Sequence, residues 1–254
     1  MGAVAGLAGG TPPEALRLAV SMTALQAAIG VLNDLIDAPL DAGRKLGKPI
    51  PAGVISARVA WATVVVSACT GVLLASISGP LLAVLALTVL AIGFSYDLVA
   101  KGTIWSWVPF AVGIPLLPVF GWLGVAGSLP SWFTPLVPSA GLAGAALAIA
   151  NARADVERDR AAGTESVATR LGCVRAWRLN AALLIVVLAV SITWLVVAGA
   201  APLRIVPVGI AAVVVLSGVV LGRHHTAGRR EWAWEIEAGG VAALGIAWVY
   251  AVTA

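Results

Sequence analysis

Two long stretches of this sequence contain no charged residue, and they limit the possible folds more than any other feature. Residues 102–152 and residues 179–203 include no Asp, Glu, Lys or Arg. A helix needs about 20 apolar residues to cross a bilayer, so the first stretch is long enough for two such helices and the second for one. Neither stretch alternates between apolar and polar residues, as the strands of a membrane barrel do. The sequence therefore predicts an all-α protein that spans a membrane.

The overall composition supports this prediction. Of the 254 residues, 60% are hydrophobic and only 11% are charged, whereas soluble domains carry about 25% charged residues. The net charge of +4 does not indicate a nucleic-acid partner, because membrane proteins concentrate Lys and Arg in their cytoplasmic loops. Abundant Ala, Val and Gly, with more Arg than Lys, are typical of a GC-rich bacterial source.

The apolar segments predict about eight membrane-spanning helices. An uncharged, glycine-rich segment at residues 1–13 precedes them, and we expect it to be a loose N-terminal tail. The predicted spans are residues 14–36, 59–78, 80–96, 104–125, 134–150, 177–198, 205–221 and 238–253.

The loops between these spans differ sharply in charge. Counting the crossings places fourteen Lys and Arg residues on one side of the membrane and only Arg17 and Arg204 on the other. Positive residues collect in cytoplasmic loops, so the basic side is predicted to be cytoplasmic. We expect a multi-pass protein of the cell membrane, with residues 229–232 at the membrane surface.

The first predicted helix runs into a group of acidic residues. Asp34, Asp37 and Asp41 are spaced by three and four residues, which places them on one helical face, about 5–6 Å apart between Cβ atoms. Crowded carboxylates repel one another unless a cation lies between them. Mg²⁺ takes oxygen ligands of this kind, often together with substrate phosphates. The sequence therefore predicts a magnesium site, the alternative being an acidic helix end in water.

A second acidic group follows the fifth predicted span. Asn151, Asp155 and Asp159 repeat at intervals of four residues, again on one face of a predicted helix. Two such groups facing each other would hold two or more divalent ions bridged by a substrate diphosphate.

Basic residues lie beside both acidic groups and favour a phosphate-containing substrate over a path for bare cations. Lys45 and Lys48 follow the first group, Arg158 lies within the second, and Lys101 begins a loop. The alternative for each of them is an ordinary cytoplasmic loop charge.

These motifs resemble those of the UbiA superfamily of intramembrane prenyltransferases. The first group, with Asn33, matches that family's NDxxDxxxD pattern in full. Lys45 and residues 48–53 resemble its basic, proline-containing loop, and Tyr96 with Lys101 resembles its YxxxK element. The second group, followed by Gly163 and Thr164, resembles its second aspartate motif. The resemblance covers residues 14–254, which we expect to form a single prenyltransferase domain.

Three features depart from the family pattern. The family usually has nine helices with the first motif on the second, so its opening helix is expected to be missing or truncated here. Ala152 stands where the second motif commonly has Asp. Tyr96 and Lys101 are separated by four residues instead of three.

The resemblance implies helices arranged around a central cavity that opens to the cytoplasm. It also implies transfer of an isoprenoid from a prenyl diphosphate to a lipophilic or aromatic acceptor, as in lipid or quinone biosynthesis, with Mg²⁺ as cofactor. The implied catalytic residues are Asp34, Asp37, Asp155 and Asp159. The implied metal ligands are Asp34, Asp37, Asp41, Asn151, Asp155 and Asp159. The implied diphosphate contacts are Asn33, Lys45, Lys48, Tyr96, Lys101 and Arg158.

Three other functions stay open. A polyprenyl-phosphate phosphoribosyltransferase and a UbiA-type terpene cyclase share these motifs. Both stay possible because Ala152 departs from the usual second motif. An ion-coupled transporter is the alternative outside catalysis. It is less favoured, because transport sites lie near the middle of the bilayer, whereas the acidic residues other than Glu14 are predicted at or in cytoplasmic loops.

Overall fold

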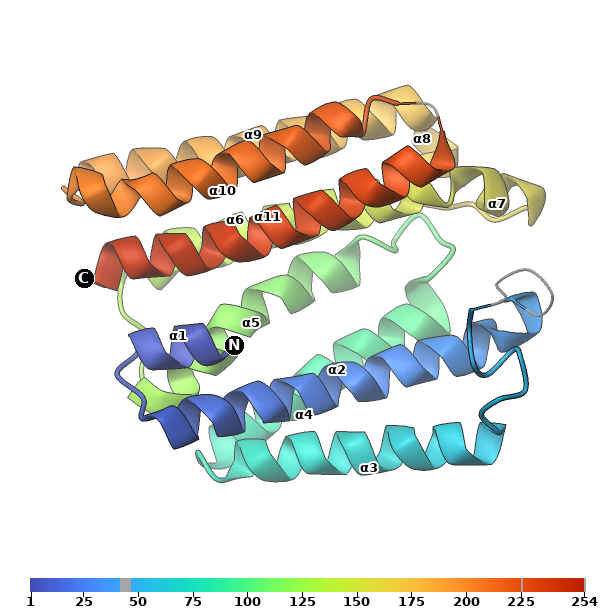
Figure 1. The fold of residues 1–254 in the computed structure, drawn as a ribbon, viewed down its shortest axis with the longest axis horizontal. Coiled ribbons are helices and arrows are strands. Elements are labelled where there is room, and N and C mark those ends of the chain that lie inside the picture. Colours follow the sequence, from blue (N-terminus) through green and yellow to red (C-terminus); the bar gives the residue numbers. More distant parts are fainter. Residues whose placement is uncertain (42–46, 225, 254) are drawn as a thin grey trace. The chain divides into compact units, whose positions relative to one another are not determined.

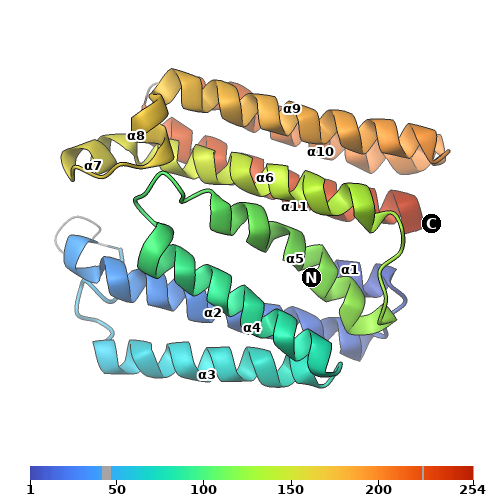
Figure 2. The ribbon, with the colours of Figure 1, turned by 180° about the vertical axis from the view of Figure 1, so that it is seen from behind.

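Figures 1 and 2 show the fold in a computed structural model, which describes residues 1–41, 47–224 and 226–253. All regular elements of this described part are helical. In chain order they are α1 (Gly2–Leu7), α2 (Pro12–Asp41), α3 (Ala57–Ser76), α4 (Pro80–Ser95), the π-helix η1 (Tyr96–Ala100), α5 (Val108–Ala126), α6 (Phe133–Ala154), α7 (Val156–Ala161), α8 (Val167–Leu171), α9 (Cys173–Val197), α10 (Pro202–Leu221) and α11 (Ala227–Thr253).

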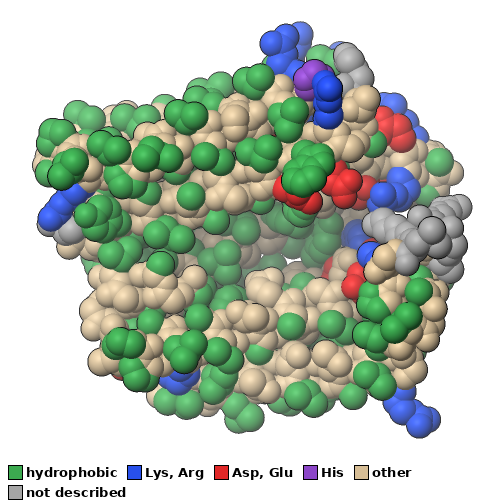
Figure 3. Space-filling model, viewed as in Figure 1, with side chains coloured by type: hydrophobic (Ala, Val, Ile, Leu, Met, Phe, Trp, Pro, Cys, Tyr) green, Lys and Arg blue, Asp and Glu red, His purple; other side chains and the backbone are tan. Residues whose placement is uncertain are grey.

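Eight helices among the described residues are long and apolar enough to cross a membrane. They are α2, α3, α4 with η1, α5, α6, α9, α10 and α11, which confirms the predicted all-α class and each predicted span. Large apolar side chains such as Val66, Leu73 and Val213 are more than half exposed. Figure 3 shows such side chains spread over the visible face of the molecule. An outer surface of this kind suits contact with lipid.

The chain divides into two compact units, and α5 contributes to both. The first unit comprises residues 1–99 and 120–128, and the second comprises residues 100–119 and 129–254. Each unit has its own packed interior. The single domain predicted for residues 14–254 stays a prediction.

In the first unit, α2 packs against three helices through glycines. Each glycine faces a large side chain of α2 so closely that an added Cβ would collide with it. The pairs are Leu25 with Gly71 in α3, Ile29 with Gly93 in α4, and Leu18 with Gly124 in α5. Small residues let membrane helices approach closely, which favours dispersion contacts where no water is present to drive association. One stripe of the helix that carries the first acidic group is therefore packed closely against three neighbouring helices.

The start of the chain differs from the predicted loose tail. Residues 2–7 form helix α1, in which Val4 and Ala5 are buried. A Cβ at Gly121 would lie 3.2 Å from Val4 Cγ1, so α1 packs directly on the last turns of α5. The prediction was wrong here because tertiary packing, which an apolar Gly- and Ala-rich segment allows, outweighs the weak intrinsic helix preference of glycine.

The second unit is built from α6, α9, α10 and α11. Helix α6 is the most buried of the eight spans, and every residue from Ala143 to Ala150 is buried. Helices α10 and α11 approach through a glycine on each. A Cβ at Gly218 would lie 2.7 Å from Glu237 Cγ, and one at Gly240 would lie 2.8 Å from Val215 Cγ2.

The largest differences between predicted and observed helix ends are in α2 and α11. Helix α2 was predicted to end at Ile36, but it continues through Pro39 to Asp41, so all of the first acidic group is helical. Helix α11 begins at Ala227, well before the predicted start of its span at Ala238. Charged residues near its beginning hid the true boundary, because a polar first turn resembles a loop when only hydropathy is considered.

Candidate functional site

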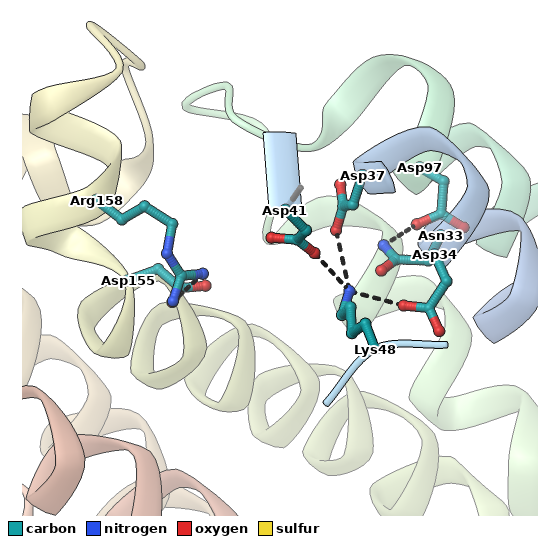
Figure 4. A network of polar contacts seen from close by, with 8 residues as sticks. All are labelled: Asn33, Asp34, Asp37, Asp41, Lys48, Asp97, Asp155 and Arg158. Carbon is teal, nitrogen blue, oxygen red and sulfur yellow. Dashed lines mark hydrogen bonds and ion pairs between the residues drawn. The ribbon is translucent and has the colours of Figure 1, made fainter. Parts of the chain in front are cut away.

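The carboxylates of Asp34, Asp37 and Asp41, called the first acidic cluster from here on, meet at one ammonium group. Lys48 Nζ lies 2.7 Å from Asp34 Oδ1, 2.8 Å from Asp41 Oδ2 and 3.8 Å from Asp37 Oδ2. Figure 4 shows the three acidic side chains pointing toward this nitrogen from the last turns of α2. The predicted arrangement on one helical face is therefore present, and it is arranged around a single cation.

A turn after the segment 42–46 brings Lys48 back to α2. Val54 N donates to Pro49 O at 2.9 Å, and Gly53 takes a φ of 73°, a conformation that glycine adopts without strain. Burial lowers the pKa of Lys48, but its hydrogen bonds to Asp34 and Asp41 outweigh that effect and raise the pKa above its ordinary value. Lys48 is therefore a charged partner of the first acidic cluster.

Asn33 is held by an acid that the sequence analysis did not select. Asn33 Nδ2 donates to Asp97 Oδ1 at 2.7 Å, and Asp97 in η1 is only 5% exposed. Figure 4 shows this bond beside the first acidic cluster. The available signal was that Asp97 ends a long apolar span, where an ionisable residue is functional by default. The bond to Asp97 orients Asn33, and its predicted contact with diphosphate stays a prediction.

The irregular spacing of Tyr96 and Lys101 has a structural explanation. Residues 96–100 form a π-helical turn, and Lys101 follows it directly. A π-helix bonds residue i to i+5, so one turn contains an additional residue compared with an α-helix. The extra residue relative to the YxxxK pattern lies within this turn. Both side chains are half-buried, and their contact with diphosphate stays a prediction.

The second acidic cluster, Asn151, Asp155 and Asp159, does not lie on one continuous helix as predicted. Helix α6 ends at Ala154 and α7 begins at Val156, with Asp155 at φ −98° and ψ 4° between them. Asp159 N still donates to Asp155 O at 2.9 Å, which preserves one helical turn across the break. Intervals of four suggested an unbroken helix, but Asp favours helix ends and turns over helix interiors.

Two basic residues lie near this second cluster. Arg158 Nη1 forms an ion pair of 2.8 Å with Asp155 Oδ1, also drawn in Figure 4. Burial raises the pKa of the Asp159 carboxyl, while a hydrogen bond from Ser166 and the positive charges of Arg158 and Lys101 oppose that rise. The fold of the second unit therefore brings Lys101 close to Asp159, which the sequence alone did not show.

The donor set of the first acidic cluster suits a hard divalent ion. Three carboxylates converge on one positive charge, and Mg²⁺ prefers oxygen ligands of this type. Among residues 1–41, 47–224 and 226–253, no three Asp, Glu, His or Cys side chains are arranged as a ready metal site. The Lys48 ammonium lies among the three carboxylates of the first acidic cluster. Lys45, a predicted diphosphate contact, lies outside the described residues.

Glu237 is buried within a membrane-spanning helix, contrary to the expectation that the acids other than Glu14 lie at or in the cytoplasmic loops. Glu237 in α11 is 2% exposed and accepts a 2.9 Å hydrogen bond from Asn180 Nδ2 in α9. Its buried position also corrects the predicted loop at residues 222–237. The Asn180 bond supports a role for Glu237 in joining α9 to α11.

Comparisons with known proteins identify the family and the fold of this chain. Residues 1–237 match the UbiA prenyltransferase family. No curated protein matched the chain. A solved UbiA homologue from Aeropyrum pernix K1, without ligand, is 19% identical over 96% of this chain and 92% of that one, with a TM-score of 0.80. A UbiA homologue from Archaeoglobus fulgidus bound to DMAPP and Mg²⁺ is 18% identical over 96% of this chain and 93% of that one, with a TM-score of 0.72. A structure of digeranylgeranylglyceryl phosphate synthase is 14% identical over 99% of this chain and 93% of that one, with a TM-score of 0.72.

The shared fold extends over nearly the whole chain in each comparison. At identities below 20% this likeness establishes the arrangement of helices and not the substrate. The family match covers far more than half of the sequence and includes the helices that carry both acidic clusters. The chain thus belongs to the UbiA prenyltransferase family.

Proposed function

We propose that this protein transfers an isoprenoid group from a prenyl diphosphate to a lipophilic or aromatic acceptor in a magnesium-dependent reaction. The observation that carries the proposal is the convergence of Asp34, Asp37 and Asp41 on one cation at the end of an apolar helix. A UbiA homologue of the same fold has been solved with DMAPP and Mg²⁺, which supports this donor class.

The two acidic clusters have related roles in this proposal. Asp34, Asp37 and Asp41 would hold one divalent cation, and Asn151, Asp155 and Asp159 would hold another. Magnesium would neutralise charge on the departing diphosphate when bound there. Lys48 leaves the carboxylates and contacts diphosphate oxygens, and Lys101 and Arg158 contribute further positive charge.

The bond changes follow from the substrate. The bond between the allylic carbon and the diphosphate oxygen breaks, and its electron pair leaves with the diphosphate. The acceptor gives an electron pair to the carbon and loses a proton. Lys48, Lys101 and Arg158 favour the separated charges because their own charges are fixed before the bond breaks.

Both clusters are proposed to face the cytoplasm. Four crossings separate the end of α2 from the end of α6, so the two helix ends emerge on one side if each helix spans the bilayer. The basic residues of the connecting loops favour the cytoplasmic side. In a variant with Cys69 and Cys173 replaced by Ser, Val54→Cys should resist an impermeant thiol reagent in intact cells. Leu129→Cys, on the opposite loop, should react; the reverse result would invert the topology.

The activity is tested with purified protein in lipid, Mg²⁺ and a panel of prenyl diphosphates. Diphosphate release and lipid products are followed with and without a membrane extract as the source of acceptor. Release that requires both Mg²⁺ and extract supports the proposal, and mass spectrometry then identifies the acceptor. Release without extract, giving a cyclic hydrocarbon, would assign a cyclase. Absence of release from every donor would contradict prenyl transfer and favour the phosphoribosyl reaction or transport.

A further inference from the structure

Two buried arginines in the second unit have no part in the chemistry proposed above. Arg153, in the last turn of α6, is 5% exposed, and Arg230, in the first turn of α11, is 3% exposed. The predicted surface position of residues 229–232 is therefore wrong for Arg230. A buried charge is costly unless it is paired, so each arginine needs a partner in the fold.

The partners of these arginines lie on either side of Asp155. Arg153, two residues before Asp155, donates from Nη2 to Gly222 O at 2.7 Å. Glu157, two residues after it, forms an ion pair with Arg230 Nη2. Gly222 caps the end of α10 and Arg230 belongs to the start of α11. The broken segment that carries the second acidic cluster is thus attached at two points to the connection between α10 and α11.

Helix α7 needs such attachments. It has only six residues, and a helix this short has no stability of its own in water. Its apolar side is anchored by Val156, which is fully buried against Ile149, Ala168 and Ala176. Its charged side carries Glu157, whose side chain is 58% exposed and forms the ion pair with Arg230.

The far end of the connection is itself fixed. Trp177 Nε1 in α9 donates to Val219 O in α10 at 2.9 Å, and the Arg223 guanidinium lies 5.5 Å from the centre of the Trp177 ring. These contacts hold the end of α10 against α9. Gly222, which accepts the hydrogen bond from Arg153, therefore belongs to a helix end that is packed against α9.

We propose that Arg153, Glu157 and Arg230, called the arginine clamp, are positioning residues that set the orientation of Asp155 and Asp159. The clamp acts through α7, and none of its three residues is proposed to touch substrate. This inference rests on the proposed function, because the orientation matters for holding the divalent cation with the diphosphate. Divalent-cation binding then depends on contacts made by α10 and α11, although neither helix carries a residue of either acidic cluster.

The charges within the clamp predict which change is most harmful. Arg153 lies close enough to Arg230, Glu237 and Glu157 for their charges to interact. Glu157→Gln removes the carboxylate that is paired with the buried Arg230. Arg230→Gln leaves the largely exposed Glu157, which water can solvate. We therefore expect Glu157→Gln to loosen α7 more than Arg230→Gln does.

The first test measures backbone hydrogen exchange of residues 156–162 in lipid nanodiscs. Glu157→Gln and Arg230→Gln should each accelerate exchange by about tenfold or more, because the ion pair no longer opposes local opening. The matched controls, Glu231→Gln and Arg229→Gln, change exposed neighbours in α11 and should leave exchange as in the wild type. The exchanged pair Glu157→Arg with Arg230→Glu should restore slow exchange. Equal exchange in clamp and control variants would overturn the proposal.

The second test separates positioning from general stability. The Mg²⁺ concentration for half-maximal diphosphate release should rise about tenfold in both clamp variants, with kcat recovered at saturating Mg²⁺. Mn²⁺ binding followed by electron paramagnetic resonance should weaken in parallel without any substrate. Faster exchange with unchanged Mn²⁺ binding would reject the positioning role. Should Glu157→Gln fail to fold, Glu157→Asp, which keeps the charge and shortens the side chain, decides between the same outcomes. Absence of prenyl transfer by the wild-type protein would refute the proposed function. Hydrogen exchange and Mn²⁺ binding would still show whether the arginine clamp positions Asp155 and Asp159.

Discussion

The two acidic clusters have nearly the same spacing in the sequence but are held in different ways. The first lies on one continuous helix, and its counter-charge, Lys48, comes from a separate turn. The second lies across a helix break, and its counter-charge, Arg158, comes from the next helical turn. Apolar packing against glycines fixes the first, whereas buried ion pairs and hydrogen bonds fix the second. The comparison shows that a short acidic motif specifies a ligand set without specifying its support.

The largest expected effect comes from removing a carboxylate of the first acidic cluster. Asp37→Asn keeps the size of the side chain but removes its charge, and should lower kcat for diphosphate release about 10²- to 10³-fold. The measurement is Mg²⁺-dependent turnover in lipid. Glu165→Gln, which changes a side chain that is 82% exposed, is the matched control and should keep wild-type turnover. Full activity of Asp37→Asn would remove this residue from the site.

The next effect tests the apolar support of the first cluster. Gly93→Val places a branched side chain against Ile29 and should destabilise the protein by about 1–3 kcal/mol through overpacking. Gly30→Ala, in the same region of α2, has nothing within 4 Å of its added Cβ and should be tolerated. Thermal unfolding in detergent compares the two. Equal unfolding temperatures would show that α2 is not fixed by these contacts.

A smaller effect is expected from the cation of the first cluster. Lys48→Met removes the ammonium that competes for the three carboxylates, so Mn²⁺ should bind the free protein more tightly. The same variant loses a charged hydrogen bond to the diphosphate, and KM for the prenyl donor should rise roughly tenfold. Paramagnetic titration and steady-state kinetics measure the two changes separately. Weaker Mn²⁺ binding would mean that Lys48 organises the carboxylates instead of competing for them.

The smallest effect is expected from the cation of the second cluster. The Arg158 and Asp155 side chains are 51% and 40% exposed, and exposed ion pairs contribute only about 0.2–1 kcal/mol. Arg158→Gln should therefore raise KM for the prenyl donor by no more than about fivefold. Arg160→Gln, an exposed neighbour in α7, serves as the control. A rise in KM as large as that expected for Lys48→Met would contradict the proposed difference between the two clusters.

Much of this architecture could be predicted from the sequence, because hydropathy over 20 residues reports directly on membrane burial. The eight spans and the shared face of Asp34, Asp37 and Asp41 follow from such local patterns. The break at Asp155 did not follow, since intervals of four occur equally in a bent segment. Asp97 and Glu237 were overlooked as buried groups because their partners, Asn33 and Asn180, lie far away in the sequence.

The glycine contacts of α2 also affect the activation barrier of the proposed reaction. Leu18, Leu25 and Ile29 lie on one stripe of α2, and each packs against a glycine of a different helix, so a shift of α2 along its axis would bring these side chains into collision. The carboxylates at its end have little freedom to lose when substrate arrives, and ordering them adds little to the activation barrier. Loosening α2 should slow the chemical step itself before it weakens the binding of the prenyl donor.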